Sequence, residues 1–236
     1  MRIVREPAPI RKQTAAFLRN AISEGHFKPS ERLIERKLCE LVSVSRTSIR
    51  EALRELEAEG LIKVIPNKGP VVANLTSEEA REIYQVRIVM ESLACRLFAQ
   101  RASTSQIEEL VGMLNHFERA ASKAGGREWV KAKNDFYTII LNGCGNTLVK
   151  SFLASLHARI SLLRSTSMSQ PGRPEQSLKE ITAIVRAIAR RDPEAAWENS
   201  AIHLRNAEAV ALKALASLQK DSSSGCSGID NSSQMG

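Results

Sequence analysis

Apolar residues recur at intervals of three and four over most of the chain, which places them along one side of α-helices. In the first 60 residues this spacing predicts three helices. The first covers residues 10–24, the second lies in "IERKLCELVSV", and the third lies in "VSVSRTSIREALRELEAEGLI" and ends at Gly60. Their expected buried positions are Ile10, Ala15, Leu18 and Ile22, then Ile34, Leu38 and Leu41, then Ile49, Ala52, Leu53 and Leu56.

Two short runs rich in β-branched residues follow the third helix, at Leu61–Ile65 and Pro70–Ala73. The intervening "PNKG" supplies the proline, asparagine and glycine of a tight turn, so a small hairpin is expected. Two short helices joined at "VSVS" and followed by a hairpin are typical of a winged helix-turn-helix, whose second helix enters the major groove of DNA.

From Asn74 onward the strand pattern disappears, and six helices are predicted at about 76–102, 105–122, 127–142, 147–167, 174–191 and 193–219. Their starts are marked by expected capping boxes at Thr76 with Glu79 and at Ser105 with Glu108, and by Asp192 before Pro193. The tail "DSSSGCSGIDNSSQMG" is rich in serine and glycine and is expected to be disordered.

The predicted fold is therefore mainly α, in three parts. A winged helix-turn-helix domain occupies residues 1–74, an all-α domain that closes as a six-helix antiparallel bundle occupies residues 75–219, and a disordered tail occupies residues 220–236.

Charge points to a polyanionic partner for the first of these parts. The chain has a formal net charge of +8, and residues 1–70 hold 14 Lys and Arg against 9 Glu, an excess of +5. Four widely spaced cysteines suggest neither a zinc cluster nor a disulfide framework. No apolar run is long enough for a membrane span or a signal peptide, so a cytoplasmic protein without a membrane partner is expected.

Three arginines spaced by four lie on the third predicted helix, away from its apolar stripe. Arg46 and Arg50 are nearest its amino-terminal end, and an arginine fork can pair with guanine O6 and N7 together. The hydroxyls of Ser45, Thr47 and Ser48 can donate to phosphates, and Ser48 with Glu51 forms a possible capping box. The alternative is a solvated face on which Arg50 and Arg54 pair with Glu51, Glu55 or Glu57.

The stretch "GHFKPSERLIERKLCELVSVSRTSIREALRELEAEGLIKVIPNKGPVVA" resembles the DNA-binding domain of the GntR superfamily of transcription regulators. The resemblance covers nearly the whole module, although Ser30 stands where glycine is usual, Cys39 replaces alanine, and "TSI" replaces "TPV". It implies a homodimeric regulator that binds double-stranded operator DNA. The positions that it assigns to DNA contact are Arg36, Ser45, Arg46, Thr47, Ser48, Arg50, Asn67, Lys68 and Gly69.

The later segments "IYQVRIVMESLACRLFAQRAS", "DFYTIILNGCGN" and "AIARRDPEAAWENSAIHL" resemble the FCD effector-binding domain of the FadR branch of that superfamily, and six helices point to its VanR-like subgroup. Many FCD domains hold a divalent metal with one aspartate and three histidines. Aligned on the family motifs, this chain has Lys133, Tyr137 and Ile181 at three of those positions, and only His203 matches. We therefore predict no metal and no other cofactor.

Two readings of these positions remain open. Lys133, Tyr137 and His203, with Arg87, form a direct pocket for a carboxylate or another anion in which lysine replaces the charge of the metal. Alternatively, Tyr137 and His203 are ordinary buried polar residues and Lys133 is exposed. His26, His116 and His157 are expected at the surface or as satisfied core residues.

No phosphate loop or catalytic motif is present, so an enzyme is not expected. The sequence predicts a dimeric DNA-binding repressor of metabolic genes that acts on a near-palindromic operator and responds to a small anionic metabolite. The alternatives are a DNA-binding dimer without an effector and a helical metalloenzyme with a nucleic-acid module.

Overall fold

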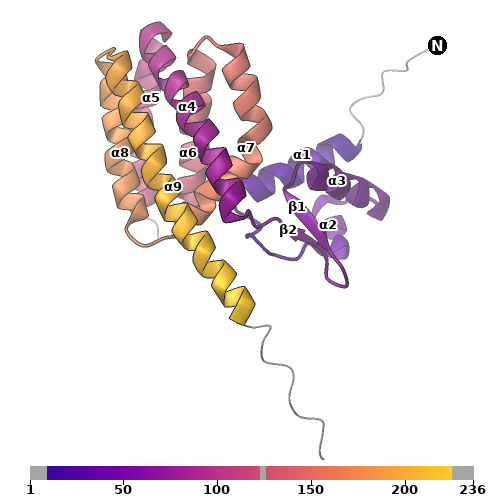
Figure 1. Ribbon diagram of the computed structural model, residues 1–236. Helices are drawn as coiled ribbons and strands as arrows, with labels where there is room; N and C mark the ends of the chain where they lie inside the picture. The colour runs from indigo at the N-terminus through magenta and orange to yellow at the C-terminus, as the bar shows by residue number, and fades with distance from the viewer. Residues whose placement is uncertain (1–9, 123–125, 225–236) are drawn as a thin grey trace, which may run out of the picture.

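The computed structural model describes residues 10–122 and 126–224, with side chains described over 10–120 and 128–217. Over these residues the chain is mainly α, as predicted, and falls into a small amino-terminal module and a larger helical bundle (Figure 1). The module contains α1 (Ile10–Ser23), α2 (Glu35–Val42), α3 (Arg46–Ala58), β1 (Ile62–Ile65) and β2 (Gly69–Val72). The bundle contains α4 (Ser77–Arg101), α5 (Thr104–Ser122), α6 (Gly126–Gly143), α7 (Thr147–Met168), α8 (Arg173–Ala189) and α9 (Pro193–Ser224).

The amino-terminal module forms around the apolar face of α3, whose four predicted core residues are all buried. α1 packs against this face, and β1 and β2 pair in antiparallel register from Ile62 opposite Val72 to Ile65 opposite Gly69. Ser30, which stands where the family usually has glycine, has a left-handed backbone with φ 66°. The module is a winged helix-turn-helix.

Three predicted core positions of the first two helices are wrong. Ile10 is 61% exposed at the first turn of α1, and Ile34 and Leu41 are 41% and 59% exposed, so only Leu38 of α2 is buried. α2 has only eight residues and packs mainly on α3, so a single position of its apolar stripe reaches the core.

Two of the three predicted helix starts in the bundle are confirmed. Thr76 and Glu79 form a capping box, and Asp192 Oδ1 accepts a hydrogen bond from Ala195 N at 3.0 Å. The third is wrong, because Ser103 and Gln106 hydrogen-bond each other's backbone amides in place of Ser105 and Glu108. The long helices α4 and α9 lie side by side along most of the bundle (Figure 1).

α7 joins the bundle to the amino-terminal module by packing on α1. Arg159 of α7 donates from Nε to the backbone carbonyl of Glu59 at 3.1 Å, and its guanidinium lies against Gly60, which has φ +71°. This positive φ favours glycine, and an added Cβ would also stand 2.2 Å from Arg159 Nη2, so the arginine would have to move. The carboxyl end of α3 is therefore held directly by the bundle.

The helix α9 continues to Ser224, beyond the predicted end at residue 219, so the disordered tail does not begin at residue 220. The rest of that predicted tail, residues 225–236, lies outside the described residues. Within the described part of the chain, no helix combines the length and the apolarity that crossing a membrane requires.

Candidate functional site

The surface of α3 presents the side chains that the sequence assigned to DNA. Arg46 is the first residue of the helix, Arg50 lies one turn later, and both are exposed. Ser45 is the N-cap: its Oγ accepts a hydrogen bond from Ser48 N at 3.2 Å and lies 3.0 Å from Ser48 Oγ. The expected cap at Ser48 is therefore wrong, since Ser48 already lies inside the helix.

Arg50 forms an ion pair, but not with a glutamate of its own helix as the alternative reading required. Its Nε lies 3.0 Å from both carboxylate oxygens of Glu35 on α2. Glu55 pairs with Arg19 of α1 instead of Arg54. The Arg50–Glu35 pair is largely exposed, so it contributes little to stability and leaves the guanidinium near the surface that would face DNA.

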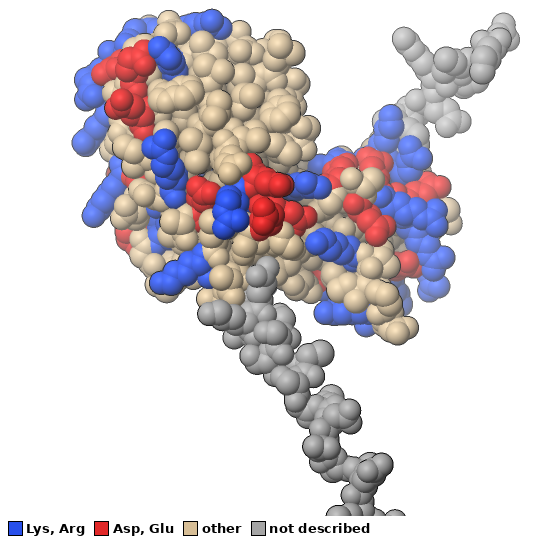
Figure 2. All heavy atoms as spheres, viewed as in Figure 1, with Lys and Arg blue, Asp and Glu red and all other residues tan. Residues whose placement is uncertain are grey.

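The hairpin turn carries the predicted wing residues. Asn67 and Gly69 have φ of 61° and 81°, and Asn67 and Lys68 are exposed at the turn between β1 and β2. Arg36 is exposed on α2. Figure 2 shows lysines and arginines gathered on the outer side of the module, away from the bundle, with acidic side chains between them.

A second group of charged side chains lies inside the bundle, where all four predicted effector-site residues are buried. Arg87, Lys133, Tyr137 and His203 are each no more than 4% exposed. The reading in which Lys133 is exposed is therefore wrong. The buried cluster, as we call it below, consists of Arg87, Glu91, Lys133, Asn134, Tyr137, Arg164, Arg173, Glu180 and His203.

One half of the buried cluster joins α4, α6 and α7. Arg87 Nε donates to Glu91 Oε1 at 2.8 Å, and Arg164 Nη2 lies 3.7 Å from the same oxygen. Arg164 Nη1 also donates to Asn134 Oδ1 at 2.6 Å, and its guanidinium carbon stands 4.4 Å from the centre of the Tyr137 ring. Burial disfavours the charge of Glu91, but the two guanidiniums outweigh it and hold its pKa below the usual range.

The other half joins α6, α8 and α9. Arg173 donates two hydrogen bonds of 2.9 and 2.8 Å to the carboxylate of Glu180. His203 Nδ1 lies 2.5 Å from Glu180 Oε2. Since Nδ1 donates to the carboxylate, His203 Nε2 is an acceptor, and Lys133 Nζ donates to it at 3.3 Å. Lys133 is thereby held by an imidazole and not by a carboxylate.

Burial therefore works against charge on Lys133 and His203. It lowers the pKa of Lys133 well below the ordinary value, helped by the charges of Arg173, Arg164 and Arg87. Burial together with Lys133 lowers the pKa of His203 to about 3, despite the hydrogen bond to Glu180. The three arginines of the buried cluster face two glutamates, so guanidiniums outnumber carboxylates there even without a charge on Lys133 or His203.

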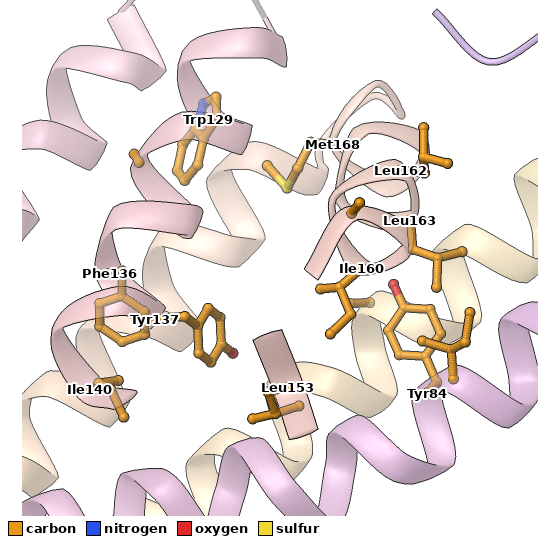
Figure 3. Packing of buried hydrophobic residues seen from close by; sticks show 14 of the residues in the cluster. Tyr84, Trp129, Phe136, Tyr137, Ile140, Leu153, Ile160, Leu162, Leu163 and Met168 are labelled. Atoms are coloured by element: carbon orange, nitrogen blue, oxygen red, sulfur yellow. The ribbon is translucent and has the colours of Figure 1, made fainter. Parts of the chain in front are cut away.

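A cavity of about 30 Å³ opens beside the first half, lined by Glu91, Asn134, Tyr137, Thr138, Leu141, Leu153, His157, Ile160 and Arg164. Figure 3 shows the Tyr137 hydroxyl pointing toward Leu153 and Ile160, which belong to this lining. The Tyr137 hydroxyl lies near Glu91 but makes no hydrogen bond of acceptable geometry, and neither does Arg164 Nε. Buried donors without acceptors, beside an excess positive charge, suit an anion.

These residues do not fit the metal that many FCD domains hold. His203 Nε2, the expected ligand atom, already accepts from Lys133, and Glu180 is engaged by Arg173, His203 and Asn206. Among the described residues, no group of three or more His, Cys, Asp or Glu side chains is arranged to hold a metal ion. An amine occupies the place that a cation would need.

Asn134, Arg164, Arg173 and Glu180 match no motif in the sequence and were not predicted, and His157 was expected at the surface or as a satisfied core residue. His157 in fact lines the cavity. The one signal available was a set of charged residues on helices that are otherwise apolar, such as Arg164 in "ISLLRSTSM". His26 pairs with Glu24 at the surface and His116 is exposed, as expected.

Comparisons with known proteins agree with this arrangement. The family described as "Bacterial regulatory proteins, gntR family" matches residues 10–72, and the family described as "FCD domain" matches residues 82–206. The transcriptional regulator YdhC of Bacillus subtilis is 29% identical over 202 residues, which cover 85% of this chain and 90% of YdhC. The transcriptional repressor RspR of Escherichia coli is 24% identical over 197 residues, or 84% of this chain and 86% of RspR. The structure of E. coli McbR/YncC superposes with a TM-score of 0.76 at 20% identity, over 88% of this chain and 99% of that one.

A winged helix-turn-helix that matches the gntR family, joined to a helical bundle that matches the FCD domain, is the architecture of a DNA-binding transcription regulator. The chain belongs to the GntR family and carries an FCD domain, as its sequence motifs indicated.

Replacing Lys133 by methionine should stabilise the protein. In the unfolded chain Lys133 is protonated at neutral pH, whereas the folded state disfavours the protonated form. Lys133 therefore lowers the free energy of unfolding at pH values below about 10.4, the pKa of lysine in an unfolded chain. Lys133→Met should raise the melting temperature at pH 7, and the gain should vanish as pH rises toward that value. Exposed Lys131, whose replacement by methionine should change the free energy of unfolding by less than about 0.5 kcal/mol, is the control. A loss of stability in Lys133→Met at pH 7 would show that the amine is charged and paired.

Proposed function

We propose that this chain is a homodimeric cytoplasmic repressor that binds a near-palindromic operator and releases it when a small anionic effector binds the bundle with its charged group at the buried cluster. Residues 1–74 bind DNA, and residues 75–219 bind the effector and dimerise. The observation that carries the effector is the excess of guanidiniums over carboxylates in the buried cluster beside donors that have no acceptor.

The DNA-reading role rests on the placement of α3. Arg46 and Arg50 occupy the first turns of the helix that a winged helix-turn-helix inserts into the major groove, where bidentate pairing with guanine is possible. Ser45, Thr47 and Ser48 at the helix start, Arg36 on α2, and Asn67, Lys68 and Gly69 in the wing provide phosphate and minor-groove contacts. When DNA binds, Arg50 leaves its exposed ion pair with Glu35 and forms hydrogen bonds with a base instead.

Dimerisation follows from the way such modules read DNA. One recognition helix covers only a few base pairs, so a two-fold pair that contacts two half-sites supplies the specificity that one copy lacks. Repression is supported by the name of the relative RspR, a transcriptional repressor that aligns over most of both chains.

The effector is proposed to be an anion that binds without a metal. An anion beside Arg164 and Tyr137 would accept from the unpartnered donors and neutralise the excess charge of the buried cluster. It would also favour the protonated form of Lys133, so binding takes up a proton. The rival is a DNA-binding dimer whose bundle has no effector.

Loss of either recognition arginine should abolish discrimination between sequences. The probe is the duplex that the wild-type protein selects from a randomised library, compared with a scrambled duplex. Arg46→Ala and Arg50→Ala should each lose about 1 to 3 kcal/mol of binding to the selected duplex while binding the scrambled one nearly as before. Arg54→Ala, also exposed on α3, should weaken both duplexes alike. Unchanged discrimination in the first two variants would refute the assignment of base reading to α3.

The anion site has a matched pair of tyrosines with which to test it. Tyr137 and Tyr84 are both buried and both lie under a guanidinium, but only Tyr137 lines the cavity. Titration with acetate, lactate, succinate and inorganic phosphate, followed by thermal shift, should identify at least one that binds. Tyr137→Phe should weaken that binding about five- to tenfold, the value of one hydrogen bond, and Tyr84→Phe should not.

If none of the four anions stabilises the wild-type protein, the rival without an effector is favoured. If Tyr84→Phe weakens binding as much as Tyr137→Phe, the anion does not bind in the cavity.

A further inference from the structure

The cavity beside Tyr137 is too small to hold a whole organic effector. Its volume of about 30 Å³ is enough for about two water molecules, whereas pockets for small molecules commonly measure about 300 to 1,000 Å³. It can receive a carboxylate group and little more. The rest of any ligand bound there has to lie in an adjoining space.

Such a space exists on the outer side of the same helices. A groove of about 560 Å³ is lined by Thr138, Leu141 and Asn142 of α6, by Lys150, Leu153, Ala154, Ser155, His157 and Ala158 of α7, and by Arg19 and Glu59 of the amino-terminal module. Thr138, Leu141, Leu153 and His157 line both the groove and the cavity. The two spaces therefore adjoin each other, and these side chains of α6 and α7 form the wall between them.

The chemistry changes along this path. The cavity is lined by Arg164 and Tyr137, which attract an anion, and by the Glu91 carboxylate, which is paired with Arg87. In the groove, Leu141, Leu153 and Ala154 form an apolar part beside Arg19, Glu59 and Lys150. The volume of the groove is large enough for a chain of several methylenes. We propose that the effector is an elongated amphipathic carboxylate, with its head group in the cavity and its apolar chain in the groove between α7 and the DNA-binding module. This inference rests on the proposed anion site.

The groove also offers a direct route from ligand to DNA. Glu59 in its wall is the residue whose backbone carbonyl receives Arg159 of α7, and its carboxylate is held by Arg19 Nε at 2.7 Å. An apolar chain in the groove thus contacts the junction that sets how α3 stands relative to the bundle. Short anions that reach only the cavity do not touch this junction and should bind without changing DNA affinity.

The test is a series of straight-chain carboxylates, namely acetate, hexanoate and decanoate, each kept below its micelle concentration and titrated by calorimetry. Affinity should rise about three- to fourfold for each methylene buried in the groove. Ala154 is exposed and faces the groove, so Ala154→Trp should fill it without disturbing the core. In that variant decanoate should bind at least tenfold more weakly while acetate binds as before.

The matched control is Ser151→Trp, an exposed position on the same helix outside the lining of the groove, which should leave the whole series unchanged. Tyr137→Phe should weaken every member by the same factor. Only decanoate should lower affinity for the selected duplex, measured by fluorescence anisotropy.

Two results would refute binding of the chain in the groove and leave the proposed anion site intact, provided that acetate binding depends on Tyr137. The first is an affinity that does not rise with chain length, and the second is an equal effect of Ala154→Trp and Ser151→Trp. Decanoate binding that Tyr137→Phe does not weaken would overturn the placement of the head group. If no carboxylate binds at all, the proposed anion site itself fails, and this inference fails with it.

Discussion

The structure of the bundle depends on how it keeps three guanidiniums and two carboxylates away from water. Each glutamate is held by an arginine at hydrogen-bond distance, since a buried charge without a partner costs several kcal/mol. The arginines outnumber the glutamates, and burial holds the pKa of Lys133 and of His203 below their usual values, which disfavours further positive charge there. Five helices contribute to the cluster, so its pairing also fixes how α4, α6, α7, α8 and α9 stand against one another. An excess of buried guanidiniums over carboxylates lowers the stability of the fold, but it favours the binding of an anion.

The same helices connect this site to the DNA-binding module. α7 carries Arg164 at the buried cluster, Leu153 and His157 at the wall of the groove, and Arg159 at the junction with Glu59. A ligand that displaces one face of α7 therefore acts on the carboxyl end of α3, the helix that presents Arg46 and Arg50. No long series of intervening contacts is needed, because α7 contacts both the proposed effector site and Glu59, the C-cap residue of α3.

Local features could be read from the sequence and long-range ones could not. Helix spacing, the Thr76 capping box and the turn at Asn67 depend on neighbouring residues, so they were predicted closely. Lys133 and His203 were found through positions in the family pattern. Arg173 and Glu180 were missed because their meeting with His203 depends on the packing of α8 against α9. Ile34 and Leu41 were placed in the core because spacing alone does not show that a helix of eight residues has one neighbour.

If the buried cluster receives an anion, it should gain a proton when it does so. Calorimetric titration with acetate at pH 7.5 in two buffers of different ionisation enthalpy, Tris and HEPES, measures the protons exchanged on binding. We expect a net uptake of protons, because the anion offsets the neighbouring arginines and favours the charged form of Lys133. Binding with the same heat in both buffers, and so without proton uptake, would contradict it.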